Sequence, residues 1–260
     1  MISVGVDLSA EAEKTALAEV HWSGGGAVVC EVSLQVDNPA ILRACVRADK
    51  VGIDCPFGWP DLFVDFVIEH RQGHVRPRTG RPKDWRRLLA NRVTDLVVRE
   101  TVAMIPLSVS ADRIAHAAFR CAALLAELAA SGEHVDRSGV TGKVVEVYPA
   151  ASLNQWQLTS RGYKRAANLT RLDGLVDALR ASAPWLDLGA HEPLLRSNDD
   201  AFDSVVAALA ARAAWLGLTS RPTAEQLAAA HTEGWIALPE PGSLVDLVRS
   251  EDVRSPLRPG

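Results

Sequence analysis

Five acidic side chains stand at points of the sequence where a carboxylate can do chemistry. Asp7 and Asp54 each close a short apolar run, in VGVD and VGID, and Glu146 lies inside the apolar run VVEVY. Asp200 and Asp203 are three residues apart in NDDAFDSVVAALAA, so a helix there projects both from one face. Carboxylate oxygens are preferred ligands of hard divalent cations. If these residues converge, they form an acidic metal site.

Such a site suits the hydrolysis of a phosphodiester bond. Two divalent cations about 4 Å apart stabilise both the attacking and the leaving oxygen of that reaction. We therefore predict a catalytic candidate at Glu146 and ligands for Mg²⁺ or Mn²⁺ at Asp7, Asp54, Asp200 and Asp203. Each acid also has an ordinary structural interpretation, because Asp opens turns and acids in the first turn of a helix favour its dipole. The prediction requires Asp7, Asp54 and at least one of the Asp200/Asp203 pair to lie within about 8 Å of one another.

The first part of the chain has the pattern of a sheet that would carry two of these acids. Apolar runs predict strands over 1–8, 15–22, 26–36 and 50–54, and SGGG after residue 22 is a turn signal. Between the third and fourth strands, Asn38 and Pro39 open a helix that ends near residue 48. A strand that returns after a helix normally runs parallel to its neighbour, so Asp7 and Asp54 are expected at the same edge of the sheet.

The rest of the chain is mainly helical, apart from one strand. Residues 61–140 predict a helical insertion with its clearest helix at 114–130, and a fifth strand follows at 143–148. Further helices are expected at 164–181 and from a cap at Ser197 or Asn198 to Gly217. This order predicts an α/β fold: a ribonuclease H-like mixed five-stranded sheet with helices on both faces and the insertion between strands four and five. We expect one domain over 1–240 and a C-terminal tail over 241–260.

The charge of the chain is unevenly distributed. The 260 residues carry a net charge of −4, whereas the segment 71–99 has nine Lys and Arg residues and two acids. Such asymmetry indicates a partner, and contacts from Lys and Arg to phosphates carry no base information. We predict phosphate contacts at Arg76, Arg78, Arg81 and Arg92, and hence a nucleic-acid partner. The alternative is a solvated basic surface.

Composition narrows the class of protein. No stretch approaches the roughly 20 apolar residues of a membrane helix, so no membrane association is expected. Asp7 interrupts the N-terminal apolar run, which argues against a signal peptide. The four cysteines form no CxxC pair, which favours free thiols in a reduced cytoplasm. The glycines of SGGGAV lack the spacing of a nucleotide-binding loop.

Five motifs resemble the DUF429 family when they are taken in order: VGVDLS, VGIDCPFGWP, VVEVYPAAS, NDDAFDSVVAALAARAA and EGWIALP. They extend over about residues 2–239. That family is predicted to be a nuclease of the ribonuclease H-like superfamily. The resemblance implies metal-site roles for Asp7, Asp54 and the Asp200/Asp203 pair, and Glu146 fits the E-x-Y-P motif.

A sixth motif, RVTD, also resembles the family pattern. Within it Arg92 would bind a phosphate while Asp95 holds the guanidinium in place. The alternative is an ion pair on a helix surface.

Three functions follow from these observations. The first is a divalent-metal-dependent nuclease that acts on DNA or RNA by a two-metal mechanism. The second is an actin-like phosphotransferase, which usually needs two such domains and a glycine-rich phosphate loop. The third is a non-catalytic nucleic-acid-binding protein of the same fold. The oligomeric state does not follow from the sequence.

Overall fold

Three apolar runs near the N-terminus form an antiparallel meander, as predicted. They are β1 (Ile2–Asp7), β2 (Ala16–Ser23) and β3 (Gly26–Leu34), and β2 pairs antiparallel with both neighbours. Gly24 and Gly25 have positive φ angles, which only glycine adopts freely, so they make the tight turn between β2 and β3. The computed structural model describes residues 1–75 and 82–248 of the chain.

Helix α1 (Asn38–Arg47) returns the chain to β4 (Lys50–Asp54), which pairs parallel with β1. This adjacency confirms the sequence prediction. The helix cap is a correction, because Asp37 rather than Asn38 is the N-cap: its Oδ1 accepts a hydrogen bond from the Ala40 amide at 2.9 Å. Asn38 lies inside the helix, and its Oδ1 accepts from Nε of Arg120 at 2.7 Å.

The sheet has six strands instead of the predicted five. Its order is β5-β4-β1-β2-β3-β6, with β5 (Val144–Glu146) parallel to β4 and β6 (Leu186–Asp187) parallel to β3. The strand β6 has two residues, so it shows no alternating pattern in the sequence. The strand β6 forms only because it pairs with β3, which is distant in the sequence. The mixed sheet and its helices on both faces agree with the predicted α/β class.

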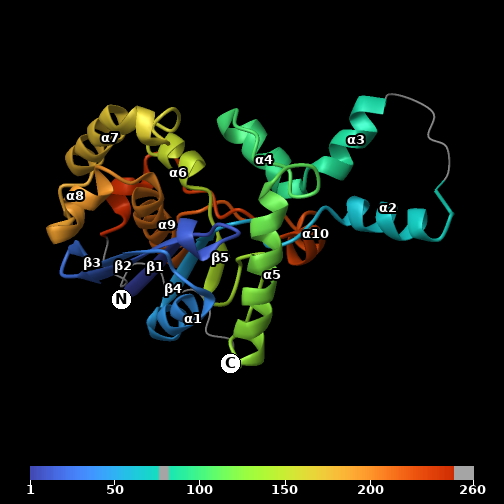
Figure 1. Cartoon of the computed structure of the whole chain (residues 1–260), viewed down its shortest axis with the longest axis horizontal. Coiled ribbons are helices and arrows are strands. Elements are labelled where there is room, and N and C mark those ends of the chain that lie inside the picture. Colours follow the sequence, from blue (N-terminus) through green and yellow to red (C-terminus); the bar gives the residue numbers. More distant parts are fainter. Residues whose placement is uncertain (76–81, 249–260) are drawn as a thin grey trace.

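Helices fill the predicted insertion and most of the chain after β5 (Figure 1). Those of the insertion are α2 (Asp61–Arg71), α3 (Pro82–Ala90), α4 (Val93–Val102) and α5 (Ile114–Ala130). Those after β5 are α6 (Pro149–Gln155), α7 (Leu169–Ser182), α8 (Glu192–Leu195), α9 (Asp199–Trp215) and α10 (Leu227–Glu233). The bounds of α5 match the prediction, whereas α6, α8 and α10 were not predicted. None of the helices in the described ranges is long and apolar enough to cross a membrane.

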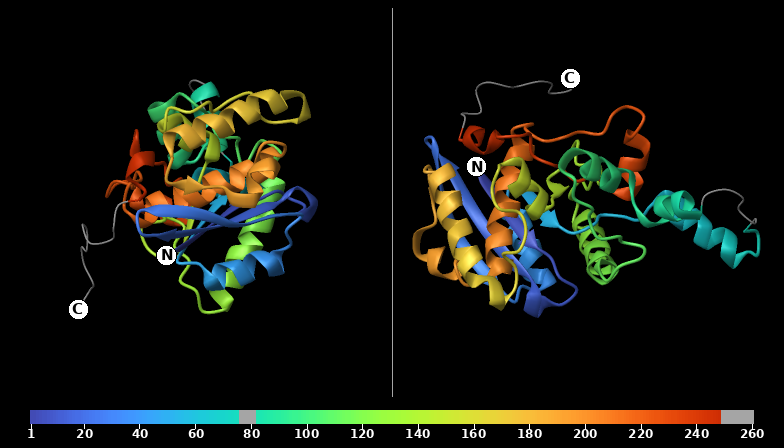
Figure 2. Two further views of the ribbon diagram at one scale, coloured as in Figure 1. Left: turned by 90° about the vertical axis from the view of Figure 1, so that its left-hand side faces the viewer. Right: turned by 90° about the horizontal axis from the view of Figure 1, so that it is seen from above.

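The two faces of the sheet bury separate cores. On one face α6, α7 and α9 pack over β2, β3 and β5, and on the other face α1 and α5 cover β1 and β4. Figure 2 shows these layers from two further directions, with α2 and α3 projecting to one side of the body. The start of the predicted C-terminal tail belongs to the first core, because Leu244 and Leu247 are buried there.

Helix α9 lies directly on the backbone of β1 and β4. A Cβ atom added to Gly5 would overlap the backbone of Ser204 and Ala208, and one added to Gly52 would stand 2.5 Å from the carbonyl oxygen of Ala207. Gly5 and Gly52 are register partners, so together they leave a surface without side chains on which the helix packs. Only glycine permits so close an approach of helix to strand.

We predict that Gly5→Ala lowers the free energy of unfolding by about 3 kcal/mol or more, because the added methyl group forces α9 away from the sheet. The matched control is Gly174→Ala in α7, where the added Cβ meets no atom within 4 Å. That control should leave stability unchanged or raise it by up to about 1 kcal/mol through helix propensity. Urea denaturation measures both. Equal effects of the two substitutions would contradict this packing account.

Candidate functional site

Two of the predicted acids face α9 from the ends of neighbouring strands. Side chains alternate along a strand, and Val6 and Ile53 pack into the core under α1 and α5. Asp7 and Asp54 therefore point to the opposite face, on the same side as α9. They are direct register partners in the parallel pair of β1 and β4, so the strands place them side by side.

Helix α9 brings two further acids over these strand ends. Asn198 is its N-cap, as predicted, and accepts a hydrogen bond from the Ala201 amide at 2.8 Å. Asp200 and Asp203 follow in the first two turns. Asp200 lies close enough to Asp7 for each side chain to affect the pKa of the other. All four predicted metal ligands therefore gather at one edge of the sheet.

These acids form the floor of a cavity of about 920 Å³. Asp7, Asp54 and Asp200 line the cavity directly. Asp203 lies behind them and is fully buried. Its Oδ1 accepts a hydrogen bond from Tyr163 Oη at 2.8 Å, and its Oδ2 is 2.5 Å from Lys164 Nζ.

Burial, together with the crowding of like charges, raises the pKa values of all four acids. Burial, with repulsion from Asp203 and Asp54, raises the pKa of Asp7 well above its usual range. Burial raises the pKa of Asp54 to about 7, with the ammonium of Lys164 opposing the shift and Asp203 adding to it. The pKa values of Asp200 and Asp203 are also raised, chiefly by burial. Lys164 is thus the cation that offsets the negative charge of this cluster.

Whether this site suits a metal ion depends on which of its oxygen donors are free. Among the described residues, no group of three or more His, Cys, Asp or Glu side chains is arranged to hold one. Asp203 has both oxygens engaged by Tyr163 and Lys164. The remaining donors, Asp7, Asp54 and Asp200, are oxygen ligands with excess negative charge, which is the chemistry that a hard divalent cation requires. The donor types fit such an ion, and three aspartates rather than four are available to it.

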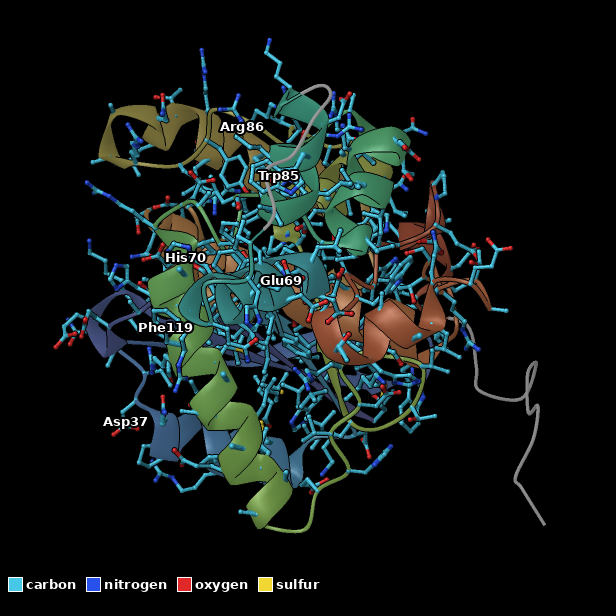
Figure 3. The ribbon with its side chains drawn as sticks, turned by 90° about the vertical axis from the view of Figure 1, so that its right-hand side faces the viewer. Asp37, Glu69, His70, Trp85, Arg86 and Phe119 are labelled. Atoms are coloured by element: carbon cyan, nitrogen blue, oxygen red, sulfur yellow. The ribbon has the colours of Figure 1, made fainter. Side chains whose placement is uncertain are left out.

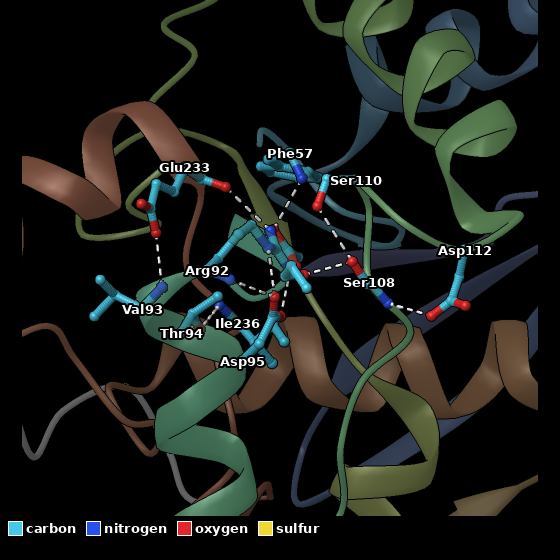
Figure 4. A network of polar contacts seen from close by, with 12 residues as sticks. Phe57, Arg92, Val93, Thr94, Asp95, Ser108, Ser110, Asp112, Glu233 and Ile236 are labelled. Carbon is cyan, nitrogen blue, oxygen red and sulfur yellow. Dashed lines mark hydrogen bonds and ion pairs between the residues drawn. The ribbon is translucent and has the colours of Figure 1, made fainter. Parts of the chain in front are cut away.

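Glu146 belongs to a second ionic cluster, which is centred on Arg92. Figure 4 shows Arg92 in this cluster together with Asp95 and Glu233. Its carboxylate receives two hydrogen bonds from Arg92, at 2.6 and 2.8 Å, and its Oε2 also accepts from the Phe57 amide at 2.9 Å. Arg92 also donates to the carboxylate of Asp95, at 2.9 and 3.2 Å, and to the carbonyl oxygen of Glu233. Glu146 is therefore held as the partner of a buried arginine, and it fixes the turn that follows Asp54.

The environment of Arg92 fits neither of the two interpretations of the RVTD motif, which were a phosphate contact and an ion pair on a helix surface. Its side chain is 1% exposed, so its ion pairs lie in the interior and not on a helix surface. All three guanidinium nitrogens donate to protein acceptors, and none of the five N–H groups is left for a phosphate. The three-residue spacing of Arg92 and Asp95 in the sequence predicts their ion pair, but it does not predict that both side chains are buried. In this arrangement Arg92 joins the insertion to the sheet.

The basic segment 71–99 does not form the cavity wall in the described part of the chain. Only Arg92 of its described residues lines the cavity. Figure 3 shows Trp85 and Arg86 of α3 near His70 of α2, on the side of the molecule where α2 and α3 project. The predicted phosphate contacts Arg76, Arg78 and Arg81 lie outside the described residues.

Four exposed cations that were not predicted line the cavity instead. They come from three separate segments, which is why no basic cluster in the sequence marks them: Lys14, Arg113, Arg161 and Arg165. Tyr163 and Lys164, which hold Asp203, were also missed. The only local signal for them is the run RGYKR between two helical regions.

Comparison with known proteins gives one match. The family model described as "Protein of unknown function (DUF429)" matches residues 5–227. No curated protein matches the chain, and no solved structure matches it.

We predict that Arg92→Leu lowers the free energy of unfolding by about 3–5 kcal/mol, because it leaves Glu146 and Asp95 buried without their cation. Arg196→Leu is the matched control, since Arg196 also contacts three carboxylates, but at the surface. Its loss should be about 1 kcal/mol. Chemical denaturation of both variants tests the difference, and a loss at Arg92 no larger than that at Arg196 would refute the interpretation of Arg92 as a buried anchor.

Proposed function

We propose a function for this chain, which belongs to the DUF429 family: it is a divalent-metal-dependent nuclease that hydrolyses phosphodiester bonds of DNA or RNA. One observation carries the proposal. Four carboxylates line a single cavity: Glu146 is paired with Arg92, whereas the other three, from β1, β4 and α9, have more negative charge than Lys164 offsets. An excess of buried negative charge favours the binding of a cation.

In this proposal Asp7, Asp54 and Asp200 hold Mg²⁺ or Mn²⁺. When bound, a pair of such cations supplies the charge that stabilises the attacking and leaving oxygens of a phosphodiester displacement. Asp203 acts indirectly, because it orients the ammonium of Lys164 towards the cavity. Glu146 and Arg92 set the turn after Asp54 and so position that carboxylate.

The topology supports a ribonuclease H-like fold as part of the same proposal. Strands β1 to β3 form an antiparallel meander, and β1, β4 and β5 run parallel, which agrees with the mixed sheet that the predicted order of elements led us to expect. The two-residue strand β6 adds to the free edge of β3. The connection from β1 to β2, LSAEAEKT, contains no glycine, which disfavours the phosphate loop of an actin-like phosphotransferase.

We predict that Mn²⁺ stabilises the wild-type protein against thermal unfolding, by about 2.7 kcal/mol when its free concentration is 100 times the dissociation constant. Asp7→Asn should abolish this stabilisation, whereas Asp173→Asn, an exposed acid on α7, should retain it. Since protons compete with a cation for Asp54, whose pKa is about 7, the effect should grow as the pH rises through that value. A thermal melt at several pH values measures this.

A cleavage screen with the same proteins tests the reaction itself. The substrates are single-stranded, duplex and branched DNA and RNA, each with Mg²⁺, Mn²⁺ or a chelator. We expect cleavage that depends on the metal and is lost in Asp7→Asn but not in Asp173→Asn. Binding of nucleic acid without cleavage in every arm would instead indicate a non-catalytic binding protein.

The basic segment 71–99 gives a separate prediction. Neutralising Arg76, Arg78 and Arg81 together should weaken nucleic-acid binding uniformly across sequences, because contacts to phosphates carry no base information. The slope of log affinity against log salt should fall by about one for each lost contact. Binding titrations at several salt concentrations measure this, and an unchanged affinity and slope would mean that these charges are a solvated surface.

A further inference from the structure

We propose that the cavity binds an unpaired nucleic-acid strand, with Arg113 and Arg165 contacting its phosphates and Ile105 and Leu107 packing against its bases. The inference rests on the proposed function, because it names the substrate class of the same site. Four observations support it. They are the cations at the rim of the cavity, the fixed loop that carries two of these cations, the size of the cavity and its apolar lip. The rim cations are Lys14, Arg113, Arg161 and Arg165, and the lip is formed by Ile105 and Leu107.

Three cations at the rim of the cavity have no acidic partner in the part of the chain that the structure describes. The side chains of Lys14, Arg113 and Arg165 are exposed and line the cavity. Within residues 1–75 and 82–248, none of the three forms an ion pair. Each nucleotide of a strand carries one negative charge, which the acidic floor repels and the rim attracts. A phosphodiester held by the rim would therefore lie across the carboxylates.

The loop that carries Arg161 and Arg165 is held firmly in place. Arg165 has φ of 81°, a left-handed conformation that a residue with a side chain keeps only where its surroundings impose it. Its amide donates to Asp199 Oδ2 at 3.1 Å, and the preceding Lys164 is anchored on Asp203. The rim is therefore built before a ligand arrives, which lowers the entropy cost of binding.

The two walls of the cavity are joined to each other. Nη2 of Arg161 donates to the carbonyl oxygen of Ala103 at 3.1 Å, which ties the loop to the segment MIPL that follows Ala103. A volume of about 920 Å³ is in the upper part of the range of small-ligand pockets. Such a cavity admits one or two nucleotides, whereas a duplex is too large to enter it.

The segment opposite the loop supplies an apolar surface. Ile105 and Leu107 line the cavity, yet their side chains are 59% and 60% exposed. Exposed large apolar side chains beside unpaired cations suit a ligand that has both apolar faces and negative charge. An unpaired base offers its faces to apolar side chains, whereas a base inside a duplex has its faces covered by its neighbours.

Fluorescence anisotropy with labelled oligonucleotides tests the proposal. All proteins carry Asp7→Asn, so that cleavage does not disturb the titration, and the probes are single-stranded and duplex DNA and RNA of mixed sequence. We expect single strands to bind at least about tenfold more tightly than duplexes, a difference of about 1.4 kcal/mol. The DNA and RNA arms identify which strand is preferred.

Substitutions at the rim and lip then assign the contacts. Arg113→Gln and Arg165→Gln should each weaken single-strand binding severalfold and reduce the salt slope by about one. Leu107→Ala should weaken binding with an unchanged salt slope, because it removes an apolar contact. The control is Arg43→Gln on α1, an exposed arginine of the helix that packs on the opposite face of the sheet, which should bind like the parent.

The outcomes separate this inference from the nuclease proposal. Unchanged affinity and salt slope in both arginine variants, or equal binding of duplex and single strand, would overturn the inference whatever the cleavage screen shows. Weaker binding in these variants, together with no metal-dependent cleavage by the wild-type protein, would support the strand-binding cavity and refute the nuclease.

Discussion

The close contact of α9 with the backbone of β1 and β4 is the constraint on which the site depends. Gly5 and Gly52 let the helix lie on the strands without intervening side chains. Two residues further along each strand, on the same face, stand Asp7 and Asp54. The contact also fixes which turn of α9 passes over the strand ends, and Asp203 lies in that turn. The packing of the backbones therefore brings the acids together although their charges repel one another.

Two cations, the buried Arg92 and the half-exposed Lys164, offset part of that repulsion and divide the acids into two groups. Arg92 forms ion pairs with Glu146 and Asp95 in the interior, and Lys164 lies against Asp203. The first group is structural, since Glu146 also binds the turn after Asp54, and the carboxylate of Glu233 accepts the amides that begin α2 and α4. The second group leaves Asp7, Asp54 and Asp200 facing the cavity, and burial together with repulsion from Asp203 and Asp54 raises the pKa of Asp7.

The sequence predicted what depends on local pattern and missed what depends on distant contacts. Helix 114–130, the cap at Asn198 and the pairing of the strands that end at Asp7 and Asp54 follow from periodicity, capping and connection rules. The strand β6 has two residues and no pattern of its own. Burial of Arg92 and the gathering of rim cations from three segments arise from tertiary packing, which spacing along the chain does not encode.

The central claim is that the packing of α9 on β1 and β4 assembles carboxylates for a divalent cation. Anomalous diffraction from crystals soaked in Mn²⁺ tests it most directly, because the ion's position is seen without reliance on activity. The account predicts an anomalous peak in the cavity, coordinated by Asp7 together with Asp54 or Asp200, while Lys164 remains beside Asp203. A peak only at other acidic side chains, with these three aspartates unbound at saturating Mn²⁺, would contradict it.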